Sequence, residues 1–505
     1  MKTAFARVAA LPVLLLASTS ALAQEAASEG AYDAAAEIAV QVDRIETLDD
    51  GENGIQAVLV RSLTAGFKAR EAQDTGILKG RSVLVKDNIE TEEWATTAGS
   101  LALAQNYTRR DAPLIANIRS NGGVILGKTN LSEWANIRSN DSTSGWSAVG
   151  GLTRNPHAID RNTCGSSSGS GAAIAAGFAW GAIGTETNGS ITCPASINGV
   201  VGFKPSVGIV SRTHVVPISS TQDTAGPMTK TVSDAALLLT AMAGEDPADA
   251  VTMTAQNRTD YTQGLGEYSL EGVRIGVMRG QIGNRDDVRG VFEQSLADLE
   301  RAGAVLVDIE FEVNTQMYGN SFTVLLFELR EEMGKYLASI PEIDGKPTPR
   351  SLTDLIAFNK ANADREMRWF EQGIFQVAEQ TTDRAAYEKA RENAVRIAGE
   401  ETLDLLLADN DVEFLVAPTR GPAWVSDLVL GDNFNGSIGF GSPAAIAGYP
   451  HLTVPMGAIE GLPVGISFFG AKWEDHAVLK AGAAYERART AKLPAPSFKR
   501  WKPAE

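Results

Sequence analysis

Histidine and cysteine are scarce in this 505-residue chain, which contains only four histidines and two cysteines. The histidines form no His-Glu-x-x-His motif and pair with no cysteine at the spacing of metal ligands, so no metal site is expected. Gly-Lys-Ser/Thr does not follow the glycine-rich run at 164–171, and no serine has a lysine three positions later. The first absence argues against a phosphate-binding loop at 164–171, the second excludes the Ser-x-x-Lys enzymes, and no cofactor is predicted.

Positive charge is also in deficit, with 45 Lys and Arg against 62 Asp and Glu and a net charge of −17. Nucleic-acid binding depends on clustered basic residues, so nucleic acid is not an expected partner.

The N-terminus has the pattern of a secretory leader. Lys2 and Arg7 precede the apolar run 8–17, and Ala-Leu-Ala at 21–23 is a small-x-small cleavage site. The pattern predicts a signal peptide over 1–23, a mature start near Gln24 and a periplasmic or secreted protein. Removal of residues 1–23 would change the net charge of the chain to −19. No later run of eighteen apolar residues is present, so no membrane association is expected after cleavage.

The order of apolar patterns predicts an α/β fold. We expect an N-terminal helical segment over 24–75 and then one large α/β domain over 76–500, without a linker or repeat. Strands are predicted at 82–85, 124–127, 273–277, 305–309, 414–417, 451–455 and 464–469. Helices are predicted at 114–120, 169–182, 288–301, 385–407 and 475–489.

Two small-residue loops and one lysine carry the chemical signal. Residues 184–194 (Gly-Thr-Glu-Thr-Asn-Gly-Ser-Ile-Thr-Cys-Pro) place Ser190 behind consecutive backbone N–H groups, as in an acyl-transfer nucleophile with its oxyanion hole. Residues 164–171 (Cys-Gly-Ser-Ser-Ser-Gly-Ser-Gly) form the second loop. Lys86 ends an apolar segment, where desolvation can lower the pKa of its amine toward neutrality.

Each feature also has a structural interpretation. Gly/Ser turns commonly serve only backbone geometry, and Lys86 could simply pair with Asp87. Residues 165–169 also match Gly-x-Ser-x-Gly, which would make Ser167 the nucleophile of a histidine-dependent hydrolase. Cys164 and Cys193 lie one in each loop, and two alternatives stay open for them: one disulfide, or two small buried side chains.

Taken together, these segments resemble the amidase signature family, whose members share a Ser-Ser-Lys triad with the central serine in a cis peptide. The resemblance covers roughly residues 30–490. It includes further matches at 127–135, 155–156, 199–205, 222–228, 448–450, 454–455 and 462–465. It implies the amidase-signature fold, a large mixed β-sheet covered on both faces by α-helices.

The resemblance also implies roles for individual residues. Ser190 corresponds to the nucleophile and Lys86 to the base. The bridging serine of the family lies twenty-four residues before the nucleophile, which gives Ser166, with Ser167 as its hydrogen-bonding neighbour. The implied oxyanion hole consists of the backbone N–H groups of Thr187, Asn188, Gly189 and Ser190. Supporting roles fall to Glu186 and Asp223.

Two departures from the common family pattern narrow the expected substrate. Asn188 stands where many members have Gly, and Thr192 stands where many have Arg. The form Glu-Thr-x-Gly-Ser-Ile-Thr-Cys-Pro resembles the peptide amidase branch, which implies hydrolysis of C-terminal peptide amides through an acyl-enzyme, with release of ammonia. The expected partner is therefore a small-molecule or peptide amide.

The alternatives are a broader aryl or fatty acyl amidase or esterase of the same family and, outside enzymes, an exported solute-binding protein. Residues 310–440 match the shared pattern least, so we expect them to shape specificity.

Overall fold

The computed structural model describes residues 32–503 apart from 52–53, 258 and 343–347. The signal peptide predicted for 1–23 therefore lies outside the described residues. Residues Ala34–Glu505 form one compact unit.

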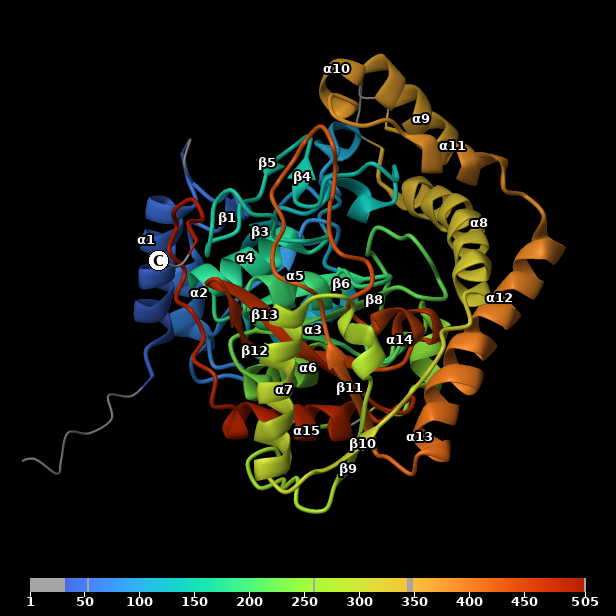
Figure 1. Cartoon of the computed structure of the whole chain (residues 1–505). Helices are drawn as coiled ribbons and strands as arrows, with labels where there is room; N and C mark the ends of the chain where they lie inside the picture. The colour runs from blue at the N-terminus through green and yellow to red at the C-terminus, as the bar shows by residue number, and fades with distance from the viewer. Residues whose placement is uncertain (1–31, 52–53, 258, 343–347, 504–505) are drawn as a thin grey trace, which may run out of the picture. The chain divides into compact units, whose positions relative to one another are not determined.

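An eleven-stranded mixed sheet forms the centre of this unit (Figure 1). Its strand order is β1-β3-β2-β6-β8-β7-β12-β13-β11-β9-β10, and β4 and β5 pair separately. The strands are β1 Val58–Arg61, β2 Ser82–Lys86, β3 Val124–Thr129, β4 Trp146–Ser147, β5 Gly151–Leu152, β6 Gly181–Glu186, β7 Val201–Lys204, β8 Thr224–Thr229, β9 Arg274–Val277, β10 Val305–Asp308, β11 Phe414–Pro418, β12 His451–Ile459 and β13 Leu462–Phe469. Strands β3, β2 and β6 run parallel, as do β11, β9 and β10, whereas the other neighbours are antiparallel.

Alternating apolar residues in the central strands bury both faces of the sheet. In β2, Val83 and Val85 belong to one core cluster and Leu84 to another. The first cluster packs under α3 Pro113–Ser120, α6 Val232–Met242, α7 Asp286–Arg301 and α15 Asp475–Ala488.

The opposite face is covered in two parts. Core clusters on this face involve α1 Ala34–Leu48, α2 Ala65–Ala72, α4 Ser168–Ala176, α5 Thr192–Ile197, α13 Leu405–Asp409 and α14 Gly441–Ala447. Helices on both faces of a mixed sheet confirm the predicted fold class.

The remaining helices come from the segment after β10. They are α8 Gln316–Ser339, α9 Leu352–Ala361, α10 Ala363–Glu366, α11 Gly373–Gln380 and α12 Arg384–Ala398. Helices α8 and α12 pack side by side (Figure 1).

The structure departs from the sequence expectation at several places, and strands β6, β7 and β8 lie in segments for which no strand was predicted. Strand β1 lies within the segment expected to be helical. The helix predicted over 169–182 ends at Ala176, because Gly177 adopts a left-handed φ of 73° and β6 begins at Gly181. A π-helical stretch, Gly399–Asp404, interrupts the helix predicted over 385–407. No helix among the described residues is long and apolar enough to span a membrane.

Candidate active site

Lys86 lies at the carboxyl end of β2, where the parallel pairing with β6 brings it beside Thr185. Its side chain is fully buried. The amine donates to Ser166 Oγ at 2.7 Å, to Thr185 Oγ1 at 2.8 Å and to the Thr185 carbonyl at 3.2 Å. The topology thus joins the lysine to one of the predicted serines.

Burial lowers the pKa of the Lys86 amine to about 7, because the charged form loses its hydration, while the negative charges of Asp223 and Glu186 oppose this shift. A neutral amine can accept a proton, whereas an ammonium cannot. Near pH 7, Lys86 can therefore act as a base.

A second buried lysine, Lys128, is the ion-pair partner of Asp87. Lys128 forms an ion pair with Asp87 at 2.9 Å and also donates to the Ile89 carbonyl and to Thr96 Oγ1. The alternative in which Lys86 pairs with Asp87 is therefore wrong.

Ser166 is buried and follows a cis peptide bond from Gly165, as the family resemblance implies. Its carbonyl accepts the N–H of Ser132 at 3.0 Å. A Cβ on Gly165 would lie 2.1 Å from Ser132 Oγ, so a larger residue at this position would displace the Ser132 side chain. This close approach fixes the loop that holds the Ser166 hydroxyl against Lys86.

Ser167 has a different environment from the one expected. Its hydroxyl donates to the Thr185 carbonyl at 3.1 Å and accepts the Thr185 N–H at 3.2 Å, rather than bonding to Ser166. Its own N–H donates to the Ser190 carbonyl at 3.1 Å, so Ser167 ties the two loops together. It is fully buried, and no described histidine hydrogen-bonds to it. This geometry disfavours Ser167 as a nucleophile.

The turn at 187–190 presents free donors. None of its four backbone N–H groups donates a hydrogen bond within the described part of the chain. Gly189 adopts a φ of 84°, which a side chain would resist. Behind the turn, Glu186 Oε2 accepts the N–H groups of Ile191 and Thr192 at 2.8 and 3.0 Å. Thr192, one of the two departures from the family pattern, thus contacts the buried carboxylate of Glu186.

Asp223 holds the other side of the turn. It accepts the Thr187 hydroxyl at 2.6 Å and the N–H groups of Ile218 and Ser219 at 2.8 Å each. Burial raises the pKa of this carboxyl, and the hydrogen bond from Thr187 counteracts the shift. Glu186 and Asp223 therefore position the turn, and neither residue lines the cavity that Ser190 lines.

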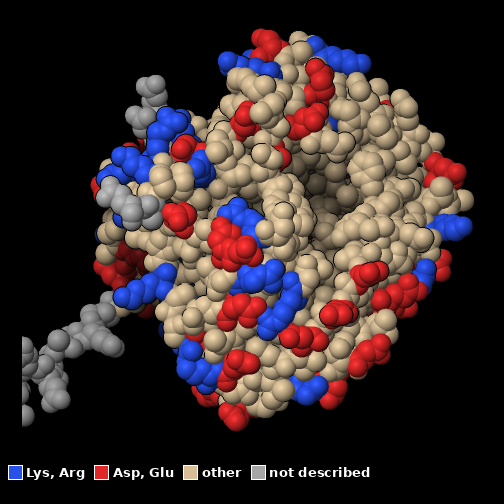
Figure 2. All heavy atoms as spheres, viewed as in Figure 1, with Lys and Arg blue, Asp and Glu red and all other residues tan. Residues whose placement is uncertain are grey.

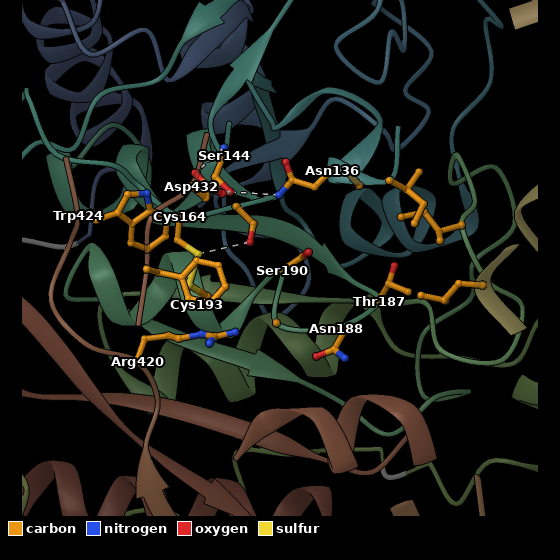
Figure 3. A pocket seen from close by; sticks show the side chains of 17 residues that line it. Asn136, Ser144, Cys164, Thr187, Asn188, Ser190, Cys193, Arg420, Trp424 and Asp432 are labelled. Atoms are coloured by element: carbon orange, nitrogen blue, oxygen red, sulfur yellow. Dashed lines mark hydrogen bonds between the residues drawn. A yellow bond between two sulfur atoms is a disulfide. The ribbon is translucent and has the colours of Figure 1, made fainter. Parts of the chain in front are cut away.

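Ser190 lines a cavity of about 250 Å³, together with Thr187, Asn188 and Gly189 (Figure 3). The half-buried Ser190 hydroxyl makes no hydrogen bond within the described part of the chain. The opposite walls come from other elements, namely Ala135, Asn136, Ile137, Ile218, Leu325, Arg420, Trp424, Asp432 and Phe434. Figure 2 shows a hollow, bordered mainly by uncharged surface, between α8 and the segment 419–440.

A disulfide joins Cys164 and Cys193 and forms part of the cavity wall. Cys164 lies two residues before Ser166, and Cys193 three residues after Ser190. The cross-link therefore connects the two serine loops covalently, which settles the alternative that the sequence left open.

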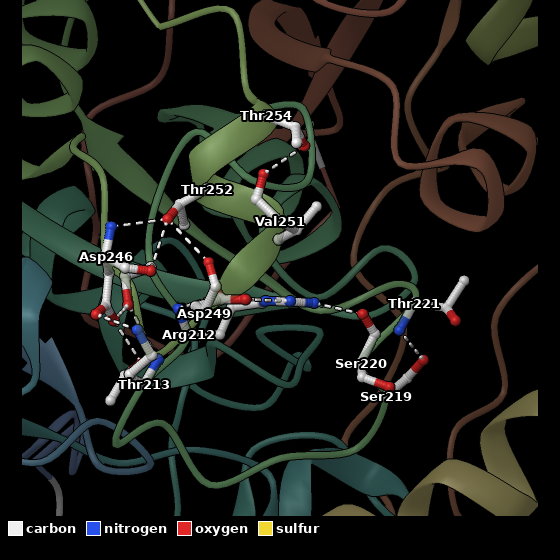
Figure 4. A network of polar contacts seen from close by, with 12 residues as sticks. Arg212, Thr213, Ser219, Ser220, Thr221, Asp246, Asp249, Val251, Thr252 and Thr254 are labelled. Carbon is white, nitrogen blue, oxygen red and sulfur yellow. Dashed lines mark hydrogen bonds and ion pairs between the residues drawn. The ribbon is translucent and has the colours of Figure 1, made fainter.

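A second cavity of about 430 Å³ shares Ala135, Thr187 and Ile218 with the first. Its wall includes a polar network centred on Arg212, which pairs with Asp249 at 2.6 Å and donates to the Ser220 carbonyl (Figure 4). The donors and acceptors of this network bond to one another, so the network stabilises the segment that ends at Asp223.

The described residues contain no group of three or more histidine, cysteine or acidic side chains that could hold a metal ion. Two contributors to the site were missed from the sequence. Thr185 was part of the quoted run, but only the strand pairing reveals that it accepts from Lys86. Arg420 follows β11, and no local pattern connects it with the distant serine loops.

Comparisons with known proteins agree with this architecture. The family model described as Amidase matches residues 38–479. A probable amidase of Arabidopsis thaliana is 37% identical over 434 residues, covering 84% of this chain and 79% of that protein. Native peptide amidase from Stenotrophomonas maltophilia superposes with a TM-score of 0.85 at 43% identity, covering 92% of this chain and 96% of that one. A peptide amidase in complex with the competitive inhibitor chymostatin gives a TM-score of 0.87 at 44% identity, with the same coverage.

The fold is thus that of an α/β amide hydrolase. The chain belongs to the amidase signature family, and it is an amidase, acting on linear amide bonds.

Proposed function

We propose that the enzyme hydrolyses C-terminal amides of peptides and releases ammonia, with Ser190 as nucleophile, Ser166 as proton bridge and Lys86 as base. The observation that carries the proposal is the 2.7 Å bond between a buried, pKa-lowered lysine and Ser166, next to a cavity lined by Ser190 and free N–H groups.

In this mechanism Lys86 starts neutral. Ser190 Oγ attacks the amide carbonyl as its proton passes to Ser166, whose own proton passes to Lys86. The Ser190 hydroxyl, which has no partner among the described residues, would turn toward Ser166 when substrate binds. A hydroxyl suits the bridging position because it both donates and accepts a hydrogen bond.

The carbonyl oxygen becomes an oxyanion that the N–H groups of residues 187–190 would stabilise, each by roughly 3 to 4 kcal/mol. The proton then returns through Ser166 to the departing nitrogen, so that ammonia leaves and Ser190 carries the acyl group. Water hydrolyses this ester by the same relay.

The choice of a peptide substrate is supported by the similarity to solved peptide amidases, one of them bound to a competitive inhibitor. The cavity of about 250 Å³ suits an amino-acid acyl group better than a long fatty chain. We also propose export from the cytoplasm, which the leader pattern at 1–23 and the disulfide support.

The test measures the release of ammonia from a blocked dipeptide amide, of aniline from its anilide and of methanol from its methyl ester. We expect the amide to be the preferred substrate and Ser190→Ala to abolish turnover. Preference for the anilide or ester would favour the broader amidase or esterase instead. Ligand binding without turnover of any of the three would favour the solute-binding alternative.

A further inference from the structure

Arg420 is a half-buried cation without an acceptor. Its guanidinium forms no ion pair and donates no hydrogen bond within the described part of the chain. Other buried cations are satisfied: Arg138 pairs with Glu133 and donates to backbone carbonyls, and Arg212 pairs with Asp249. Leaving a partly desolvated guanidinium without acceptors costs free energy, which a ligand can recover.

The side chain lies at the reacting end of the cavity. The guanidinium carbon lies 4.9 Å from the ring centroid of Phe434, and Nη2 lies 3.8 Å from where a Cβ on Gly189 would be. Figure 3 shows the guanidinium extending from the Trp424 side toward Ser190. An acceptor bound there would be close to the acyl group on Ser190.

Asp432 is the only other charged side chain among the described residues that line this cavity. It accepts the N–H of Ser144 at 3.0 Å and the Ser144 hydroxyl at 2.5 Å, and burial raises the pKa of its carboxyl. Asp432 is therefore engaged by Ser144, and Arg420 is the one charged side chain among the described lining residues that has no hydrogen-bond or ion-pair partner.

The structural alternative is that Arg420 balances the buried charge of Glu186, which attracts it electrostatically. No hydrogen bond or ion pair joins the two side chains, although Glu186 Oε1 has no partner among the described residues; Oε2 accepts the N–H groups of residues 191 and 192. Charge balance would affect stability, but it would not discriminate between substrates.

Resting on the proposed function, we propose that Arg420 is a specificity-determining residue that selects amides whose acyl residue carries a carboxylate, such as peptides ending in glutamate amide. A guanidinium binds a carboxylate through paired hydrogen bonds, and it repels a basic side chain. The apolar walls at Ile137, Leu325 and Trp424 suit the methylene groups of a side chain that ends in a carboxylate.

The test compares kcat/KM for ammonia release from acetyl-Ala-Glu-NH₂, acetyl-Ala-Met-NH₂ and acetyl-Ala-Lys-NH₂. For the wild type we expect the glutamate amide to exceed the lysine amide by at least about 100-fold. Arg420→Gln should reduce this ratio at least about tenfold with a smaller effect on the methionine amide, and Arg420→Lys should keep the order.

Arg285→Gln is the matched control. Arg285 lies beside Arg420 in a small neighbouring cavity, but it pairs with Asp287 and does not line the cavity of Ser190. Its variant should keep the wild-type ratio. An equal ratio in the wild type and Arg420→Gln, or no preference in the wild type, would overturn the inference.

Calorimetric binding of the same three amides to Ser190→Ala separates this inference from the proposed function. Preference for the glutamate amide that disappears in Ser190→Ala/Arg420→Gln supports the subsite even if the wild type releases no ammonia, in which case the proposed hydrolysis fails. Equal binding of the three amides overturns the subsite, whatever the turnover.

Discussion

Replacing Lys86 by methionine should change how stability depends on pH. Desolvation holds the pKa of the folded-state amine at about 7, against 10.5 in the unfolded chain. Between these values the unfolded chain binds a proton that the folded protein does not, so stability of the wild type rises with pH. Below pH 7 both states are protonated, and the burial of the ammonium is most costly. Methionine does not titrate, so the stability of Lys86→Met lacks this dependence on pH.

The size of the effect follows from the two pKa values. Once the folded amine is neutral, each pH unit contributes about 1.4 kcal/mol. Integration from pH 7, where the amine is half titrated, to pH 9 gives about 2 kcal/mol in favour of the wild type relative to Lys86→Met. The lost hydrogen bonds to Ser166 and Thr185 add an offset that does not vary with pH.

Urea unfolding of both proteins at pH 7 and pH 9, followed by tryptophan fluorescence, measures this difference. Lys204 offers a comparison, because burial lowers the pKa of its amine to about 8. Lys204→Met should show the same sign, with an onset about one pH unit higher. A wild-type advantage over Lys86→Met that stays constant between the two pH values would refute the lowered pKa.

Three further outcomes are expected. Ser166→Ala should lower kcat roughly 10²- to 10⁴-fold in steady-state assays, because the proton relay is broken; a smaller loss would remove Ser166 from the mechanism. Asp223→Asn should move the acid limb of the kcat/KM profile to lower pH, since the charge of Asp223 raises the pKa of Lys86; a shift to higher pH would contradict this. Exchanging both Cys164 and Cys193 for serine should lower the unfolding free energy by roughly 3 to 4 kcal/mol in urea titrations, given the 29-residue separation; unchanged stability would show that the cross-link restrains little.

Local pattern predicts seven of the strands, including the edge strand β10, and misses β1 and the central strands β6, β7 and β8. Strand β2 was predictable because a short apolar run between turns fits a doubly buried strand. The end of α4 was not, because its alanines and glycines continue into β6 without a change in composition. Strand β1 was hidden because its four residues are only half-buried at the sheet edge.

The candidate site also has one part that the sequence reveals and another part that only the tertiary structure reveals. The residue pattern was sufficient to select Lys86 and Ser190 as candidates, whereas Ser166 was selected by the family resemblance. Their partners depend on the tertiary fold, as with Thr185, which meets Lys86 through the pairing of β2 with β6. The guanidinium of Arg420 lines the cavity and has no acceptor among the described residues, and only the folded structure shows this.

The identity of the nucleophile is the most direct test of the mechanism. The enzyme would be treated with a serine-directed fluorophosphonate, digested and mapped by mass spectrometry, with Ser190→Ala as the matched variant. We expect one adduct, on Ser190, and no labelling of the variant. An adduct on Ser167, or undiminished labelling of Ser190→Ala, would contradict it.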